Sequence, residues 1–309
     1  MSLDSTKLQL SKNEAEDSSV SDFFSLLKPR VMSLAVFTSI CGLYLAPGEL
    51  HPVLSVTAIL CISLGAGASG AINMWCDRDI DGIMARTKFR AIPMGKIHPK
   101  DVLGFGIFLA FASVIILGLA INYFAAFLLA LSIAFYIFIY TLWLKRKTHH
   151  NIVIGGAAGA FPPIIGWACV TQDITIFPLV LFLIIFVWTP PHFWALALYK
   201  DMEYSKVNIP MLPVVFGKKN TKVQIFIYSI VLFLVSSSPF FLNLTGKIYL
   251  FTSFILNGFF VYYCLKLLLG DEEKNDSDAS KVFKFSILYL YLIFIMFALD
   301  KFFSNQFYG

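Results

Sequence analysis

The residues between Asn73 and Lys96 have types and a spacing that could do chemistry. Asn73, Asp77 and Asp81 recur every four residues, where a stretch of more than twenty residues without a charge ends. In a continuous helix this spacing puts all three side chains on one face, each about 6 Å above the last. Two neighbouring carboxylates repel each other, so a bound cation is expected, and oxygen ligands of this kind suit Mg²⁺.

Basic residues follow the aspartates at once, which predicts a site for a diphosphate. Arginine forks can hold the phosphate oxygens that a metal ion leaves free. The basic side chains of this loop are Arg86, Lys88, Arg90 and Lys96. Charged loops flank every membrane helix as topology signals, but topology requires no aspartates. Asp79 falls on the far side of the helix and is interpreted as a solvated or arginine-paired charge.

A second stretch, four apolar spans later, repeats features of the first. Asp201 and Glu203 follow a span on the same side of the membrane, and the letters "IPM" occur at 92–94 and again at 209–211. A diverged internal repeat is therefore predicted. Its two loops would face each other over one cavity and supply metal ligands from both sides.

Three further residues are candidates with two interpretations each. His192 follows Pro190 and Pro191, which should break their helix. An imidazole near a membrane is a functional candidate, although it could equally hydrogen-bond a carbonyl that the break sets free. Lys145 and Arg146 could close over a diphosphate, or they could anchor the chain at the membrane surface.

Elements that could position these residues are membrane helices. Of 309 residues 58% are hydrophobic and 14% charged, whereas a soluble domain carries roughly a quarter charged residues. Apolar runs long enough to cross a bilayer recur, and spanning backbone must be helical. The fold class predicted is an all-α polytopic membrane protein. A disordered cytoplasmic tail over 1–22 is expected to precede a single nine-helix domain over 23–309. The spans predicted are 25–46, 52–75, 102–121, 123–143, 151–171, 177–199, 223–243, 248–269 and 283–303.

Lysine and arginine predict the orientation of these spans. With the N-terminus in the cytoplasm, 22 of the 24 basic residues fall on the cytoplasmic side, and only Lys247 and Lys301 fall outside. The C-terminus is then periplasmic. The net charge of +5 is explained by topology and gives no sign of nucleic-acid binding. No transit peptide precedes the first span, which favours a bacterial inner membrane.

Four stretches together resemble one known family. The segment from Asn73 to Lys96 is similar to the first aspartate motif of the UbiA-type intramembrane prenyltransferases. Three others are similar to the branch of that superfamily that farnesylates heme: "LLKPRVMSLAVFTSICGLYLA", "NIVIGGAAGAFPPIIGWACVT" and "TPPHFWALAL…IPMLPVV". The resemblance covers roughly residues 20–300. It implies nine helices around a central cavity and Mg²⁺-dependent ionisation of farnesyl diphosphate. It also implies transfer of the farnesyl group to a vinyl group of heme b, with addition of water, to give heme O on the route to heme A.

The resemblance also implies roles for individual residues. Asn73, Asp77 and Asp81 would hold Mg²⁺ and the diphosphate. Arg86, Arg90, Lys145 and Arg146 match basic positions that bind diphosphate, and His192 would contact heme, which is a substrate here. Asp201 and Glu203 are candidate metal ligands in the second loop, although Glu203 stands where the family usually has aspartate. A heme A synthase is a possible protein partner, in addition to the lipid bilayer.

Three alternatives stay open at this point. An aromatic prenyltransferase of the same superfamily, acting for example on 4-hydroxybenzoate, would use the same first motif. A secondary transporter would keep ionisable groups near the bilayer midplane, whereas the acids here cluster at one face. A non-catalytic assembly factor would leave Asp77 and Asp81 without a purpose.

Overall fold

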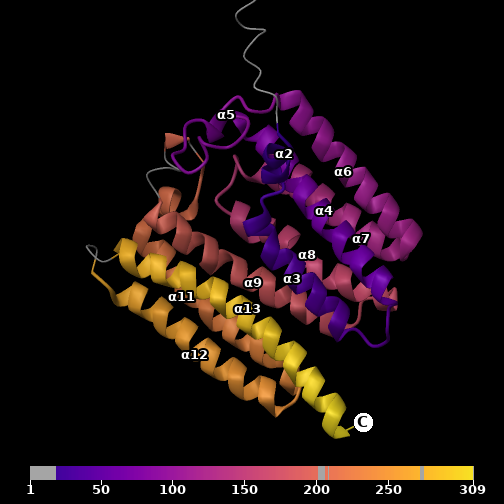
Figure 1. Cartoon of the computed structure of the whole chain (residues 1–309). Helices are drawn as coiled ribbons and strands as arrows, with labels where there is room; N and C mark the ends of the chain where they lie inside the picture. Colours follow the sequence, from indigo (N-terminus) through magenta and orange to yellow (C-terminus); the bar gives the residue numbers. More distant parts are fainter. Residues whose placement is uncertain (1–18, 201–205, 208, 272–274, 309) are drawn as a thin grey trace, which may run out of the picture.

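The computed structural model describes residues 19–200, 206–207, 209–271 and 275–308. The described residues form helices and loops and no strand (Figure 1). Eight helices are long and apolar enough to cross a membrane, and a bent pair at the N-terminal end raises the number to nine if it counts as one span. The predicted all-α membrane fold is therefore confirmed.

The first predicted span, 25–46, is this bent pair. Helix α2, Val20–Leu26, begins at a capping box formed by Ser19 and Asp22, so helix starts inside the predicted tail over 1–22. Helix α3, Pro29–Leu45, follows after a 64° bend. Between them Lys28 adopts a left-handed conformation with φ of 50°. Proline disfavours right-handed helical backbone at the residue before it, which explains a break at this point.

The remaining spans lie close to their predicted positions. The largest differences are at α11 and α13, which start well before 223 and 283. The early part of α11 is set off by a break at Gly217, with φ of 79° and ψ of 167°, and the early part of α13 is a polar, charged turn. In chain order the helices are α4 Pro52–Cys76, α5 Arg78–Asp81, α6 Pro99–Ala120, α7 Tyr123–Ala134, its π-helical continuation η1 Phe135–Leu144, α8 Asn151–Thr171, α9 Ile176–Tyr199, α11 Leu212–Phe241, α12 Lys247–Leu269 and α13 Asn275–Tyr308.

Neighbouring helices pack side by side, and α13 closes the bundle by packing against both α3 and α9. Helices α3 and α8 approach each other most closely at two glycines. A Cβ at Gly42 would overlap the backbone carbonyl of Pro163, and a Cβ at Gly166 would overlap that of Ser39. Small residues allow this contact between membrane helices. Helices α3 and α8 are therefore in direct backbone contact at these two glycines.

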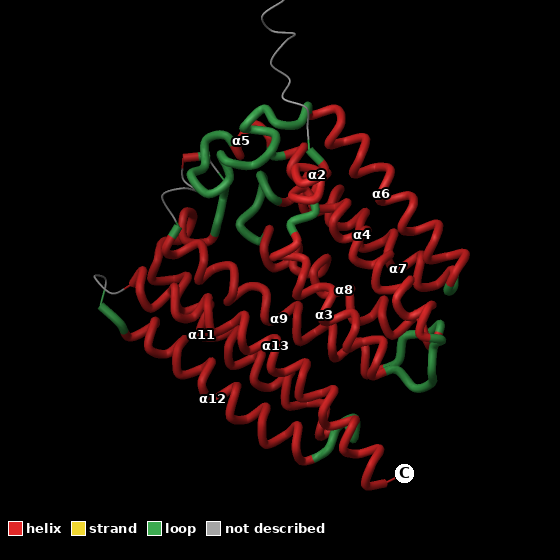
Figure 2. The backbone as a smooth tube through the Cα atoms, viewed as in Figure 1, coloured by secondary structure: helices red, strands yellow, loops and turns green. Residues whose placement is uncertain are grey.

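The loops that carry the candidate residues gather at one end of the bundle (Figure 2). The loop after α5, the turn between η1 and α8, and the segment before α11 lie at the same end as α2, whereas the C-terminal end of α13 lies at the opposite end (Figure 1). This arrangement places the first aspartate motif beside the basic turn at 145–147.

Candidate active site

Asn73, Asp77 and Asp81 lie at the junction of α4 and α5, and all three are buried, with 5%, 1% and 3% exposure. The continuous helix that the spacing argument assumed is interrupted at Asp77. Helix α4 ends at Cys76, and Asp77 caps both helices with φ of −92° and ψ of 3°. Backbone hydrogen bonds of 2.9 Å nevertheless run from the Asp77 N–H to the Asn73 carbonyl and from the Asp81 N–H to the Asp77 carbonyl. The helical pattern of hydrogen bonds between residues four apart therefore continues across the junction.

Asp77 is the centre of a network of polar contacts. Its Oδ2 accepts a 2.9 Å hydrogen bond from the Asn73 side-chain amide and forms an ion pair with the Lys145 ammonium. Its Oδ1 is buried and accepts no hydrogen bond from the described residues. The guanidinium of Arg146 lies 3.8 Å from that oxygen. Oδ1 of this buried carboxylate can therefore accept a further hydrogen bond or bind a cation.

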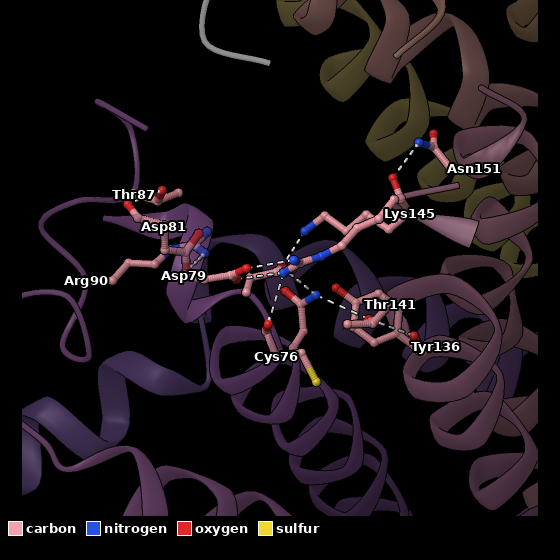
Figure 3. A network of polar contacts seen from close by, with 12 residues as sticks. Cys76, Asp79, Asp81, Thr87, Arg90, Tyr136, Thr141, Lys145 and Asn151 are labelled. Carbon is pink, nitrogen blue, oxygen red and sulfur yellow. Dashed lines mark hydrogen bonds and ion pairs between the residues drawn. The ribbon is translucent and has the colours of Figure 1, made fainter. Parts of the chain in front are cut away.

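Asp81 has a cation of its own. Arg90 donates a 2.7 Å hydrogen bond to Oδ2 of Asp81. The Thr87 hydroxyl donates to the backbone carbonyl of Asp81 at 2.9 Å and fixes the loop after α5 (Figure 3). The sequence predicted that both residues belong to one site, and the structure brings them together as an ion pair.

Arg146 forms a two-pronged pair with Asp79, through hydrogen bonds of 2.7 Å to each carboxylate oxygen. It also donates to the Cys76 carbonyl at 3.1 Å, which ties the basic turn to the end of α4. These hydrogen bonds lower the pKa of Asp79 to about 2. The interpretation of Asp79 as an arginine-paired charge is confirmed. Arg86 is exposed on the loop after α5, and its role toward a diphosphate stays a prediction.

The π-helix η1 presents Lys145 and Thr141 to the aspartates. Extended π-helical stretches are rare and occur mostly at functional sites. The Asn73 amide donates to the Thr141 hydroxyl at 3.2 Å, and that hydroxyl donates to the Tyr136 carbonyl at 2.8 Å. The absent side chain of Gly155 on α8 makes room for the Tyr140 ring. No pattern in the sequence singles out Thr141, since a lone threonine in an apolar run is common.

Lys28 is a second residue that the sequence reasoning assigned only to topology. Its ammonium donates a 3.2 Å hydrogen bond to the side-chain oxygen of Asn73. The dipeptide Lys28–Pro29 could have indicated a helix break at this position, because a residue directly before a proline disfavours helical backbone. The site thus receives side chains from α4, α5, η1 and the break between α2 and α3.

The two predicted loops meet in the structure. Ile80 of α5 and Met84 of the first loop pack in one apolar cluster with Ile209 and Met211 of the second loop. Asp201 and Glu203 lie outside the described residues. Their role as metal ligands therefore stays a prediction.

His192 is buried in α9 between two aromatic rings. The Trp188 and Phe283 rings lie 4.3 and 4.6 Å from its centroid. The prediction of a break at Pro190 and Pro191 was wrong, because α9 runs through both. The carbonyl partner suggested for the imidazole is also corrected: Nδ1 lies 2.6 Å from the Ser286 hydroxyl of α13.

The hydroxyl of Ser286 itself donates to the Phe283 carbonyl at 2.7 Å. A hydroxyl has one proton to donate, so Nδ1–H of His192 must be the donor to Ser286. That tautomer leaves Nε2 with its lone pair. Whether this nitrogen meets heme stays a prediction.

The residues present fit a magnesium ion, provided that other ligands complete its shell. Within the described ranges no group of three or more His, Cys, Asp or Glu gathers at metal-binding spacing. The available donors are the carboxylates of Asp77 and Asp81 and the amide oxygen of Asn73, all oxygen atoms. Magnesium characteristically takes one or two carboxylates together with waters and substrate phosphates, and the spare Oδ1 of Asp77 matches that need.

Comparison with known proteins identifies the family of the chain. The model of the UbiA prenyltransferase family matches residues 35–291. The chain is 51% identical over 293 residues to the protoheme IX farnesyltransferase of Agrobacterium fabrum, covering 94% of this chain and 92% of that one. It is 52% identical to the same-named protein of Parvibaculum lavamentivorans, covering 92% and 89%.

Solved structures show the same fold at low sequence identity. A digeranylgeranylglyceryl phosphate synthase superposes with a TM-score of 0.75 at 20% identity, covering 91% of this chain and 98% of that one. A UbiA homologue from Archaeoglobus fulgidus bound to DMAPP and Mg²⁺ superposes with a TM-score of 0.66 at 14% identity, covering 88% and 99%. On the extent of the family match and the identity to these relatives, the chain belongs to the UbiA prenyltransferase family.

Proposed function

We propose that this protein transfers the farnesyl group of farnesyl diphosphate to a vinyl group of heme b, with addition of water, to give heme O. The acceptor is supported by relatives about half identical over nearly the whole chain, which are named protoheme IX farnesyltransferase. The observation that carries the prenyl-transfer chemistry is the buried cluster around Asp77. Two carboxylates and a side-chain amide contact cationic side chains there, and these cations come from three separate segments of the chain.

Asn73, Asp77 and Asp81 would hold Mg²⁺, with Asp201 and Glu203 of the second loop as candidates to complete its shell. Bound there, the ion would act as a Lewis acid that neutralises charge on the leaving diphosphate. The support is the oxygen-only donor set and the spare Oδ1 of Asp77. A homologous structure of the same fold is described as bound to DMAPP and Mg²⁺.

Lys145 and Arg90 have a second part in this scheme. Each pairs with one of the two carboxylates that would hold the metal, so each would lie close to a diphosphate bound to that metal. Their N–H donors, with those of Arg86 and Arg146, are suited to hold the phosphate oxygens as charge develops on them. Such preorganised donors in a site shielded from water stabilise the departing group strongly.

Heme b would meet the farnesyl cation on the side of α9. His192 is the candidate contact, since Ser286 fixes its ring and leaves Nε2 with a lone pair. The apolar spans around the site exclude water, which keeps a reactive cation from being quenched early.

Location and partners follow from the same proposal. The distribution of lysine and arginine supports a site at the cytoplasmic face and a C-terminus on the opposite side, which is the periplasm if the membrane is a bacterial inner membrane. Heme O would pass to an enzyme that makes heme A, so a heme A synthase is the expected protein partner.

The test is a product assay. Membranes that contain the expressed chain receive heme b, farnesyl diphosphate and Mg²⁺, and heme O is sought by mass spectrometry with and without EDTA. The proposal expects one vinyl group to become a hydroxyethylfarnesyl group, by gain of a farnesyl group and a hydroxyl, and expects EDTA to abolish this change. A prenylated aromatic acid, obtained in place of heme O when 4-hydroxybenzoate is supplied, would move the protein to the aromatic branch.

A further inference from the structure

We propose that Lys28 is a diphosphate-binding residue, held at the mouth of the site by the break between α2 and α3. This inference rests on the proposed prenyl-transfer function and adds a ligand to it. It starts from the backbone of Lys28, which has φ of 50° directly before Pro29. Left-handed backbone is costly for a residue with a side chain, and strain of this kind gathers at functional sites.

The packing around the break guides the Lys28 side chain toward Asn73. Leu26 is fully buried against α4 in the apolar cluster that contains Ala71 and Met74. Carbon atoms of the Lys28 stem lie 3.6 and 4.0 Å from the position that a Cβ on Gly70 of α4 would occupy. The stem therefore runs along α4, and the ammonium ends 3.2 Å from the side-chain oxygen of Asn73.

Charge at this place points to an anionic ligand. Arg90, Lys145 and Arg146 each pair with a carboxylate of the first motif, namely Asp81, Asp77 and Asp79, whereas Lys28 contacts Asn73. Each carboxylate already has a cation other than Lys28. Within the described ranges the Lys28 ammonium donates only to the neutral amide of Asn73. Lys28 therefore faces no carboxylate partner among the described residues, and an ammonium in a buried site is stabilised by a counter-charge that a ligand can bring.

A diphosphate supplies that counter-charge. Asn73 is one of the three residues expected to hold the metal, so a phosphate oxygen bound to the metal would come within reach of the Lys28 ammonium. Lysine binds phosphate as a point charge. A purely structural lysine that only orients Asn73 would leave pyrophosphate binding unchanged once the metal is in place, and this difference decides the test.

The experiment measures binding of inorganic pyrophosphate, in saturating Mg²⁺, to the purified full-length protein in detergent by calorimetry. Lys28→Met keeps the length of the stem and removes the charge. We expect its pyrophosphate affinity to fall about 10- to 100-fold, while the melting temperature without ligand stays near that of the wild type. Lys28→Arg should recover most of the affinity. Lys100→Met, which removes an exposed cation at the start of α6, is the matched control and should bind normally.

Two results would overturn the assignment. Wild-type pyrophosphate affinity in Lys28→Met would show that Lys28 binds no phosphate. A loss of affinity for Mg²⁺ alone, as large as the loss for pyrophosphate, would show that Lys28 acts by orienting Asn73. Either result would leave heme O formation by the wild type untouched, so failure of this inference is separable from failure of the proposed function.

Discussion

Replacement of Asp77 by asparagine tests the centre of the site, and replacement of Asp79 is its matched control. The two carboxylates are two residues apart and undergo the same chemical change. Asp77 is 1% exposed and pairs with Lys145, whereas the Asp79 side chain is 58% exposed and pairs with Arg146. Because one carboxylate is buried and the other is exposed, the two substitutions should affect activity to different extents.

The structure sets the expected magnitudes. Asp77→Asn removes one of two negative charges available to Mg²⁺, and we expect turnover to fall about 1,000-fold or more, which corresponds to about 4 kcal/mol of transition-state stabilisation. The amide still offers an oxygen to Lys145, so the free energy of unfolding should fall by only about 1–3 kcal/mol. For Asp79→Asn solvent screens the lost ion pair, and turnover should change by less than about fivefold.

Heme O formation is measured for both variants at saturating Mg²⁺, with expression and melting temperature recorded beside it. A folded Asp77→Asn protein that keeps a tenth of wild-type turnover would refute the role of this carboxylate as a metal ligand. An equal loss in Asp79→Asn would refute the argument from burial, because it would show that charge alone at this face decides activity.

Three further predictions follow from contacts elsewhere in the bundle. Gly42→Ala should lower the free energy of unfolding by about 1–3 kcal/mol, since its Cβ would meet a backbone carbonyl of α8. Gly159→Ala, where the Cβ would enter open space, should leave that free energy unchanged. The melting temperatures of the two variants in detergent check this difference. Ser286→Ala should raise the KM for heme b about tenfold and leave that for farnesyl diphosphate unchanged, because His192 loses the partner that orients it; a changed KM for farnesyl diphosphate alone would count against this. The pKa of Asp79 is lowered to about 2, so its ion pair stabilises the fold above about pH 4 and is lost as the pH falls toward 2; melting of Asp79→Asn and wild type should therefore differ by a constant amount from pH 5 to 8.

Much of the fold could be read from the sequence, because hydropathy is a property of the chain itself. A helix in lipid must be apolar over about 20 residues, so the spans 52–75 and 151–171 could be placed to within a residue of α4 and α8. The acids and bases of the site were also identifiable by type and spacing. Asp77, Asp81, Arg90 and Lys145 all take part in the network that the structure shows.

Which group pairs with which was decided only by the tertiary structure. Lys28 reaches Asn73 across 45 positions in the chain and Lys145 reaches Asp77 across 68, and no local pattern encodes such contacts. The break at Asp77, the π-helix before Lys145 and the Ser286 partner of His192 likewise depend on neighbouring helices, which satisfy the polar groups that a lone helix would leave exposed to lipid. The sequence by itself determined which residues could do the chemistry and at which end of the bundle they would lie. Packing decided which cation each carboxylate holds, because ion pairing in a buried site depends on positions in space and not on distance along the chain.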